Sequence, residues 1–148
     1  MTTYTDITYH IVFGTKQRVR ALDTSRRPDL YRFVWGVLKN RDCHLYRIGG
    51  VEDHIHLLTS LHPTVALADL VKEVKTASSL WIKSEKVFPF FEQWQDGYAA
   101  FTVAAEARTA LIEYIKNQEA HHQSRPFADE LQSLVQSAGL EWKPAFLP

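Results

Sequence analysis

Two histidines, His54 and His56, are separated by a single apolar residue in the run Asp53-His54-Ile55-His56-Leu57-Leu58. Glycines precede this run and apolar residues follow it, which predicts a β-strand whose alternate side chains share one face. The two Cα atoms would lie roughly 7 Å apart, so both imidazoles could bind one divalent ion. Two histidines that merely line a polar sheet face are the alternative interpretation.

A second pair, Tyr114 and Gln118, lies in a stretch whose apolar spacing predicts a helix from about Ala104 to His121. Residues four apart in a helix lie one above the other, so this pair shares one helical face. By itself the pair equally fits a boundary tyrosine packed against a surface glutamine.

The rest of the chain predicts the elements that must position these two pairs. We expect strands at Thr5–Phe13, at Cys43–Ile48, over the histidine run and at Gly97–Val103, with Gly49-Gly50 as a hairpin turn. We expect helices capped by Thr24 or Ser25 and continuing through Leu38, at Ala66–Ser84, at Ala104–His121, and from Pro126 to Gly139.

The order strand, helix, strand, strand, helix, strand predicts an α+β fold: a ferredoxin-like split βαβ sandwich with an antiparallel sheet and extra C-terminal helices. Two helices would cover one face of the sheet and pack on Ile55 and Leu57. Alternation then places His54 and His56 on the other face. The helix over 104–121 is the expected cover for that face.

Length and composition limit the class of protein. A chain of 148 residues with 45% hydrophobic residues predicts a single domain over residues 1–148. One cysteine, Cys43, excludes an internal disulfide and a cysteine-rich zinc site, and we expect it to be buried. The sequence has neither a membrane-spanning run nor a signal peptide, so we expect a cytoplasmic protein.

The net charge of zero argues against a strongly electrostatic nucleic-acid binder, but the charges are unevenly distributed. Residues 1–50 contain nine basic and four acidic side chains. This basic stretch could contact phosphates, or it could be a solvated loop.

Taken together in this order, these motifs resemble the single-tyrosine HUH transposases of the insertion sequence 200/605 family, which include repeat-associated tyrosine transposases. The resemblance is carried by four segments: Tyr9-His10-Ile11-Val12-Phe13, Asp53-His54-Ile55-His56-Leu57-Leu58, Gln95-Asp96-Gly97-Tyr98-Ala99-Ala100-Phe101-Thr102, and Tyr114-Ile115-Lys116-Asn117-Gln118-Glu119-Ala120-His121-His122.

The resemblance implies that Tyr114 attacks a phosphodiester of single-stranded DNA, forms a 5′-phosphotyrosine and later rejoins the strands. It also implies a divalent metal, magnesium or manganese, bound by His54, His56 and Gln118. The ion would assist a phenol whose ordinary pKa of about 10 makes it a poor nucleophile. Imidazole and amide ligands suit manganese better than magnesium.

The implied partners are single-stranded DNA with hairpin ends and a second copy of the chain, whose tyrosine helix can complete the neighbouring site. Candidate contacts to the DNA backbone, chosen by position, are Lys16, Arg18, Arg20, Arg26, Arg27, Lys72 and Lys75.

Several residues near these motifs have plainer interpretations. Glu52 and Asp53 could orient the imidazoles or simply accept backbone hydrogen bonds in a turn. His121 and His122 could extend the metal site, although histidines at a helix end also suit the helix dipole.

Two other functions stay open. A two-histidine phosphoesterase would leave Tyr114 without a task, and the histidine-triad pattern needs a third histidine where Leu58 stands. A domesticated module that binds hairpin nucleic acid without cutting it would not need the nucleophile.

Overall fold

The computed structural model describes residues 2–118 and 126–144. Its four strands are β1 (Thr8–Gly14), β2 (Leu45–Gly50), β3 (His54–Ser60) and β4 (Ala99–Thr102). They form one sheet in the order β2-β3-β1-β4, and every neighbouring pair is antiparallel. Helices α1 (Arg27–Asn40) and α2 (Leu67–Ser84) connect the strands in the split βαβ order, which confirms the predicted fold class.

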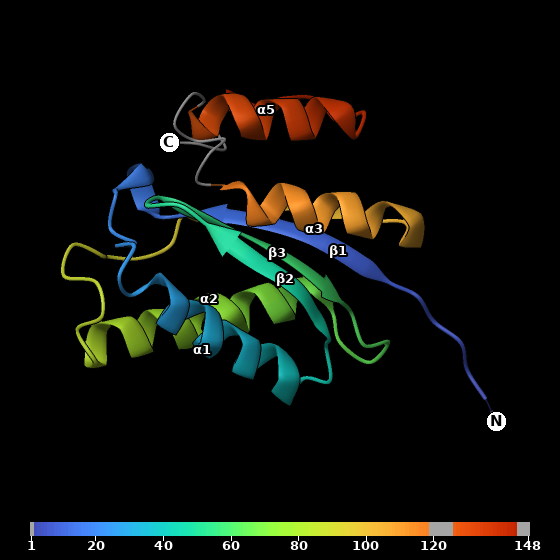
Figure 1. Ribbon diagram of the computed structural model, residues 1–148, viewed down its shortest axis with the longest axis horizontal. Helices are drawn as coiled ribbons and strands as arrows, with labels where there is room; N and C mark the ends of the chain where they lie inside the picture. The colour runs from blue at the N-terminus through green and yellow to red at the C-terminus, as the bar shows by residue number, and fades with distance from the viewer. Residues whose placement is uncertain (1, 119–125, 145–148) are drawn as a thin grey trace.

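The main hydrophobic core lies between the sheet and helices α1 and α2, which occupy one side of the sheet in Figure 1. Ile11 and Phe13 of β1 and Ile55 and Leu57 of β3 point into this core and are almost fully buried. Cys43 is buried in the same core, as predicted.

Two further helices, α3 (Arg108–Lys116) and α5 (Phe127–Ser137), cover the opposite face of the sheet (Figure 1). Helix α3 packs mainly along β2 and also contacts β3. Helix α5 encloses a second, smaller core with β1, built on Val12, Phe127 and Leu131. The sheet is therefore covered on both faces. The second face is covered by α5 as well as by α3, which lies in the helix predicted over residues 104–121.

The predicted hairpin of β2 and β3 is confirmed, but the predicted position of its turn, Gly49-Gly50, is wrong. Both glycines belong to β2, where Gly49 pairs with His56 and Gly50 with Ile55, and the chain reverses at residues 51–53. The reason is a close approach: a Cβ at Gly49 would lie 2.7 Å from the carbonyl oxygen of Ile115 in α3. Glycine is needed here because a helix backbone lies against the strand.

Other predicted boundaries shift by a few residues. Neither Thr24 nor Ser25 caps α1, which begins at Arg27 with proline in its first turn; proline needs no N–H partner there. The helix expected from Ala104 starts instead as a 3₁₀ turn, Ala105–Ala107, before α3. The last helix begins after Pro126 and is followed by Gly139 at φ +76°, as its stop signal predicted.

Within residues 2–118 and 126–144, no helix combines the length and the apolar character needed to span a bilayer.

Candidate active site on the α3 and α5 face of the sheet

Strand β3 places both histidines on the face that α3 and α5 cover. His56 lies opposite Val12 of β1 and Gly49 of β2, while His54 lies opposite Gly14. Both imidazoles have 0% exposure. The predicted alternation is thus confirmed, with Ile55 and Leu57 in the main core.

Helix α3 brings Tyr114 to the histidines. Its ring lies 5.9 Å from the His56 ring, centroid to centroid, at an interplanar angle of 79°. One turn later Gln118 is buried, and its Nε2 donates a long hydrogen bond of 3.4 Å to the carbonyl of Tyr114. Among the described residues, the Gln118 Oε1 atom is buried and has no hydrogen-bond partner.

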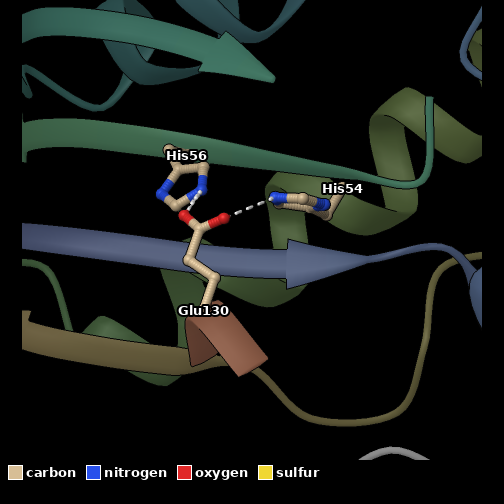
Figure 2. A group of neighbouring side chains, drawn as sticks. All are labelled: His54, His56 and Glu130. Atoms are coloured by element: carbon tan, nitrogen blue, oxygen red, sulfur yellow. Dashed lines mark ion pairs between the residues drawn. The ribbon is translucent and has the colours of Figure 1, made fainter. Parts of the chain in front are cut away.

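A carboxylate from α5, Glu130, sits between the nucleophile candidate and the histidines. Figure 2 shows its two oxygens directed at the two imidazoles: Oε1 lies 3.0 Å from Nε2 of His56, and Oε2 lies 3.8 Å from Nε2 of His54. The Tyr114 hydroxyl donates a 2.5 Å hydrogen bond to Oε1. The donor atoms of His54, His56 and Glu130 all lie within 4.8 Å of one another, so this buried group could hold a metal ion.

The other ring nitrogens of both histidines are already engaged. Nδ1 of His54 lies 2.7 Å from the Asp53 carboxylate, and Nδ1 of His56 lies 2.8 Å from Nε2 of His10. Such partners fix the ring orientation, so that Nε2 of each ring faces Glu130. Of the two acidic residues that could orient the imidazoles, Asp53 contacts His54. The exposed Glu52 side chain instead places its Oε2 3.7 Å from Nη1 of Arg20.

His10 is held neutral by its surroundings. Burial, and after it the neighbouring His56, lower the pKa of His10 to about 3, while Glu130 acts in the opposite direction. A neutral imidazole can exchange a hydrogen bond with His56 without adding a charge beside the metal-binding nitrogens.

The seven basic candidates for DNA contacts do not form one cluster. Lys16 and Arg18 are exposed in the 3₁₀ turn Lys16–Arg18, next to Thr15, whose N–H donates to the Asp53 carbonyl at 2.9 Å. They therefore lie beyond the end of β1, where Gly14 pairs with His54 at the start of β3. Arg20 is also exposed.

Arg26 and Arg27 have partners in the chain. Arg26 pairs with Asp29 at 2.7 Å, whereas Arg27 is buried and donates to Thr24 at 2.8 Å. This placement of Arg27 leaves little of its side chain for a phosphate.

Lys72 and Lys75 line an open groove of about 500 Å³ between α2 and residues 93–98. Lys72 is exposed, while Lys75 donates to the backbone carbonyls of Gln95 and Gly97. Burial lowers the pKa of Lys75 to about 8, with Asp96 opposing the shift.

His121 and His122, the other candidates for the metal site, lie outside the described residues. The sequence analysis did not identify Glu130 as a site residue. A signal for Glu130 exists in the pattern of α5: Phe127, Glu130, Leu131 and Leu134 occupy the helical positions i, i+3, i+4 and i+7. A carboxylate inside an apolar stripe indicates a buried polar role, but the pattern does not say which groups it meets.

Comparisons with known proteins agree on one family. A family model described as "Transposase IS200 like" matches residues 3–118. The ISDra2 transposase TnpA of Deinococcus radiodurans is 25% identical over 120 residues, which covers 74% of this chain and 82% of that protein.

Two solved structures share the fold. A transposase crystal structure from Deinococcus radiodurans R1 has a TM-score of 0.63 at 24% identity, covering 80% of this chain and 95% of the other. A REP-associated tyrosine transposase bound to a REP hairpin has a TM-score of 0.62 at 16% identity, covering 82% and 74%.

Proposed function

This chain belongs to the IS200-like transposase family, and on that premise we propose that it cleaves and rejoins single-stranded DNA with Tyr114 as the nucleophile. The phenolic oxygen forms a bond to phosphorus while the bond from phosphorus to the 3′-oxygen breaks. One proton leaves the phenol and one is taken up by the 3′-oxygen. Attack by another 3′-hydroxyl on the phosphotyrosine reverses the exchange and rejoins strands, so no external energy source is needed.

The observation that carries this proposal is that Tyr114 and both buried histidines converge on one carboxylate, that of Glu130. The Tyr114 hydroxyl and Nε2 of His56 approach the same carboxylate oxygen, at 2.5 Å and 3.0 Å. A water-poor environment strengthens the electrostatic interactions that stabilise a developing negative charge. A module that only binds DNA needs no such alignment.

The residues present fit a divalent ion, magnesium or manganese. The Nε2 atoms of His54 and His56 both face the Glu130 carboxylate. The buried Oε1 of Gln118 has no hydrogen-bond partner among the described residues. We propose His54, His56 and Gln118 as residues that would hold it. When bound, the ion would act as a Lewis acid on the scissile phosphate and the leaving oxygen. Imidazole and amide donors favour manganese over magnesium.

Access of DNA requires a rearrangement. His54 and His56 are fully buried, with the Phe127 ring of α5 stacked on His54 and Glu130 of α5 beside His56, so a phosphodiester reaches them once α5 shifts away from the sheet. This motion would place the substrate strand between the sheet and α5.

The proposed substrate is DNA with hairpin ends, a choice supported by the structural neighbour bound to a REP hairpin. Lys16, Arg18, Arg20 and Lys72 are exposed and are the preferred backbone contacts of the predicted set. The homodimer, the single domain over 1–148 and the cytoplasmic location stay predictions; Tyr114 already meets His56 of its own chain.

The test is incubation of the protein with a 3′-labelled single-stranded hairpin DNA and Mn²⁺, because the nucleophile keeps the 5′-phosphate of the fragment that carries the 3′ end. We expect a covalent adduct that resists denaturation, and loss of that adduct in Tyr114→Phe. Tyr4→Phe is the matched control, because Tyr4 is 92% exposed and outside the cluster. Metal-dependent turnover that survives Tyr114→Phe would favour a two-histidine phosphoesterase, and clean binding without adduct would favour a binding module.

A further inference from the structure

We propose that Glu130 is a ligand of the divalent ion in the DNA-free protein, so that His54, His56 and Glu130 form the resting metal site. The inference rests on the proposed function, because it concerns the ion of the same site. The inference goes beyond the proposed function because Glu130 lies in α5, outside residues 3–118, which match the family model.

The distances suit coordination. Bonds from a metal to imidazole nitrogen or carboxylate oxygen are about 2.0–2.2 Å, so two donors on one ion lie about 3–4.4 Å apart. The Glu130 oxygens lie 3.0 Å from Nε2 of His56 and 3.8 Å from Nε2 of His54. The ligand atoms of His54, His56 and Glu130 all lie within 4.8 Å of one another. Side-chain shifts of a few tenths of an ångström would therefore bring all three atoms within bonding distance of one ion.

Glu130 is held in this position by its neighbours on α5. The Phe127 ring stacks on the His54 ring at 3.9 Å and 12°, and Leu131 is fully buried against β1 in the second core. These contacts on either side point the Glu130 side chain at the imidazoles, as Figure 2 shows. A site on rigid elements with fixed ligand orientation is the arrangement that metal binding requires.

Charge supports the same conclusion. The Glu130 side chain is 3% exposed, and burying a carboxylate is costly unless a positive charge accompanies it. A divalent ion between the three donors would supply that charge. The orientation of each histidine by a partner on its Nδ1, Asp53 for His54 and His10 for His56, is typical of metal-binding histidines.

A purely structural role makes a different prediction. In that case Glu130 only accepts the Tyr114 hydrogen bond and favours the first turn of α5, where acidic residues suit the helix dipole. Asp129 lies in the same first turn and is exposed, so Asp129→Asn removes the same charge from the same helix end without touching the cluster.

The experiment is a titration of the DNA-free, full-length protein with Mn²⁺, in which free Mn²⁺ is followed by electron paramagnetic resonance. Glu130→Gln should weaken Mn²⁺ binding by at least about tenfold, since even the partners of metal ligands contribute about 10–100-fold. Asp129→Asn should stay within about twofold of wild type, as exposed substitutions usually do. Circular dichroism verifies that each variant is folded.

A second measurement needs no variant. Hydrogen exchange of the wild-type protein should slow over both β3 and α5 when Mn²⁺ is added, because the ion would join the two elements. Slower exchange over β3 alone, or an unchanged Mn²⁺ affinity in folded Glu130→Gln, would overturn the assignment of Glu130.

The proposed function can be judged separately. If Gln118→Leu weakens Mn²⁺ binding and Glu130→Gln does not, the ligand set His54, His56 and Gln118 stands and only the role of Glu130 is lost. Loss of the proposed function would instead appear as the absence of a Tyr114 adduct on hairpin DNA while Mn²⁺ still binds.

Discussion

Replacing Gly49 by alanine should push the tyrosine helix away from the histidines. Gly49 lies opposite His56 in the sheet, and α3 crosses it at Ile115, next to Tyr114. An added Cβ would lie 2.7 Å from the Ile115 carbonyl oxygen and 2.9 Å from its Cγ2. Because one of these atoms belongs to the helix backbone, a side-chain rotation cannot relieve the contact.

The magnitude follows from the overlap. Ordinary contacts between such atoms begin near 3.5 Å, so the helix must move by somewhat less than about 1 Å. Overpacking of this kind costs about 1–3 kcal/mol, and the gain of about 0.5–1 kcal/mol from replacing glycine in a strand offsets part of it. We expect a net loss of about 1–2 kcal/mol in the free energy of unfolding. A shift of Tyr114 by about 1 Å should lower the cleavage rate by about 10²-fold.

The assay pairs urea unfolding with adduct formation on labelled hairpin DNA in Mn²⁺. Gly36→Ala is the matched control, because a Cβ at Gly36 in α1 meets nothing within 4 Å. That change should be neutral or stabilise the protein by up to about 1 kcal/mol, with an unchanged rate. If Gly49→Ala keeps both the stability and the rate of wild type, the backbone of α3 does not pack closely on β2 at Gly49.

Three further changes test the surroundings of the site. Asp53→Asn should weaken Mn²⁺ binding by about 10–100-fold through the orientation of His54, and an unchanged affinity in the same resonance titration would remove that role. The pKa of His10 is lowered from 6.5 to about 3 in the folded protein, so between pH 3 and pH 6.5 the unfolded chain binds more protons than the folded one. The contribution of neutral, buried His10 to the free energy of unfolding is therefore full above pH 6.5 and falls as the pH drops toward 3. His10→Asn should flatten this slope by up to about 1.4 kcal/mol per pH unit in chemical unfolding at a series of pH values; equal slopes would contradict the assignment. Phe127→Ala removes the ring that stacks on His54 and should lower the free energy of unfolding by about 3–5 kcal/mol, whereas an unaltered urea midpoint would mean that α5 does not anchor on the sheet.

The sequence by itself determined the placement of residues within each element. Alternation in a strand puts His54 and His56 on one face and Ile55 and Leu57 on the other, and the structure confirms it. The order of the elements was enough to predict the split βαβ sheet. These predictions hold because the periods of strands and helices are local properties of the backbone.

Only the tertiary structure decided what covers the second face and which side chains meet there. Glu130 reaches His56 from a helix more than seventy positions later in the chain, through the docking of Phe127 and Leu131 on β1 and β3. Gly49 looked like a turn residue because its role, room for the backbone of α3, exists only once that helix has packed. A periodic pattern shows that a helix has an apolar face, but not which surface that face will meet, since docking depends on contacts between elements distant in sequence.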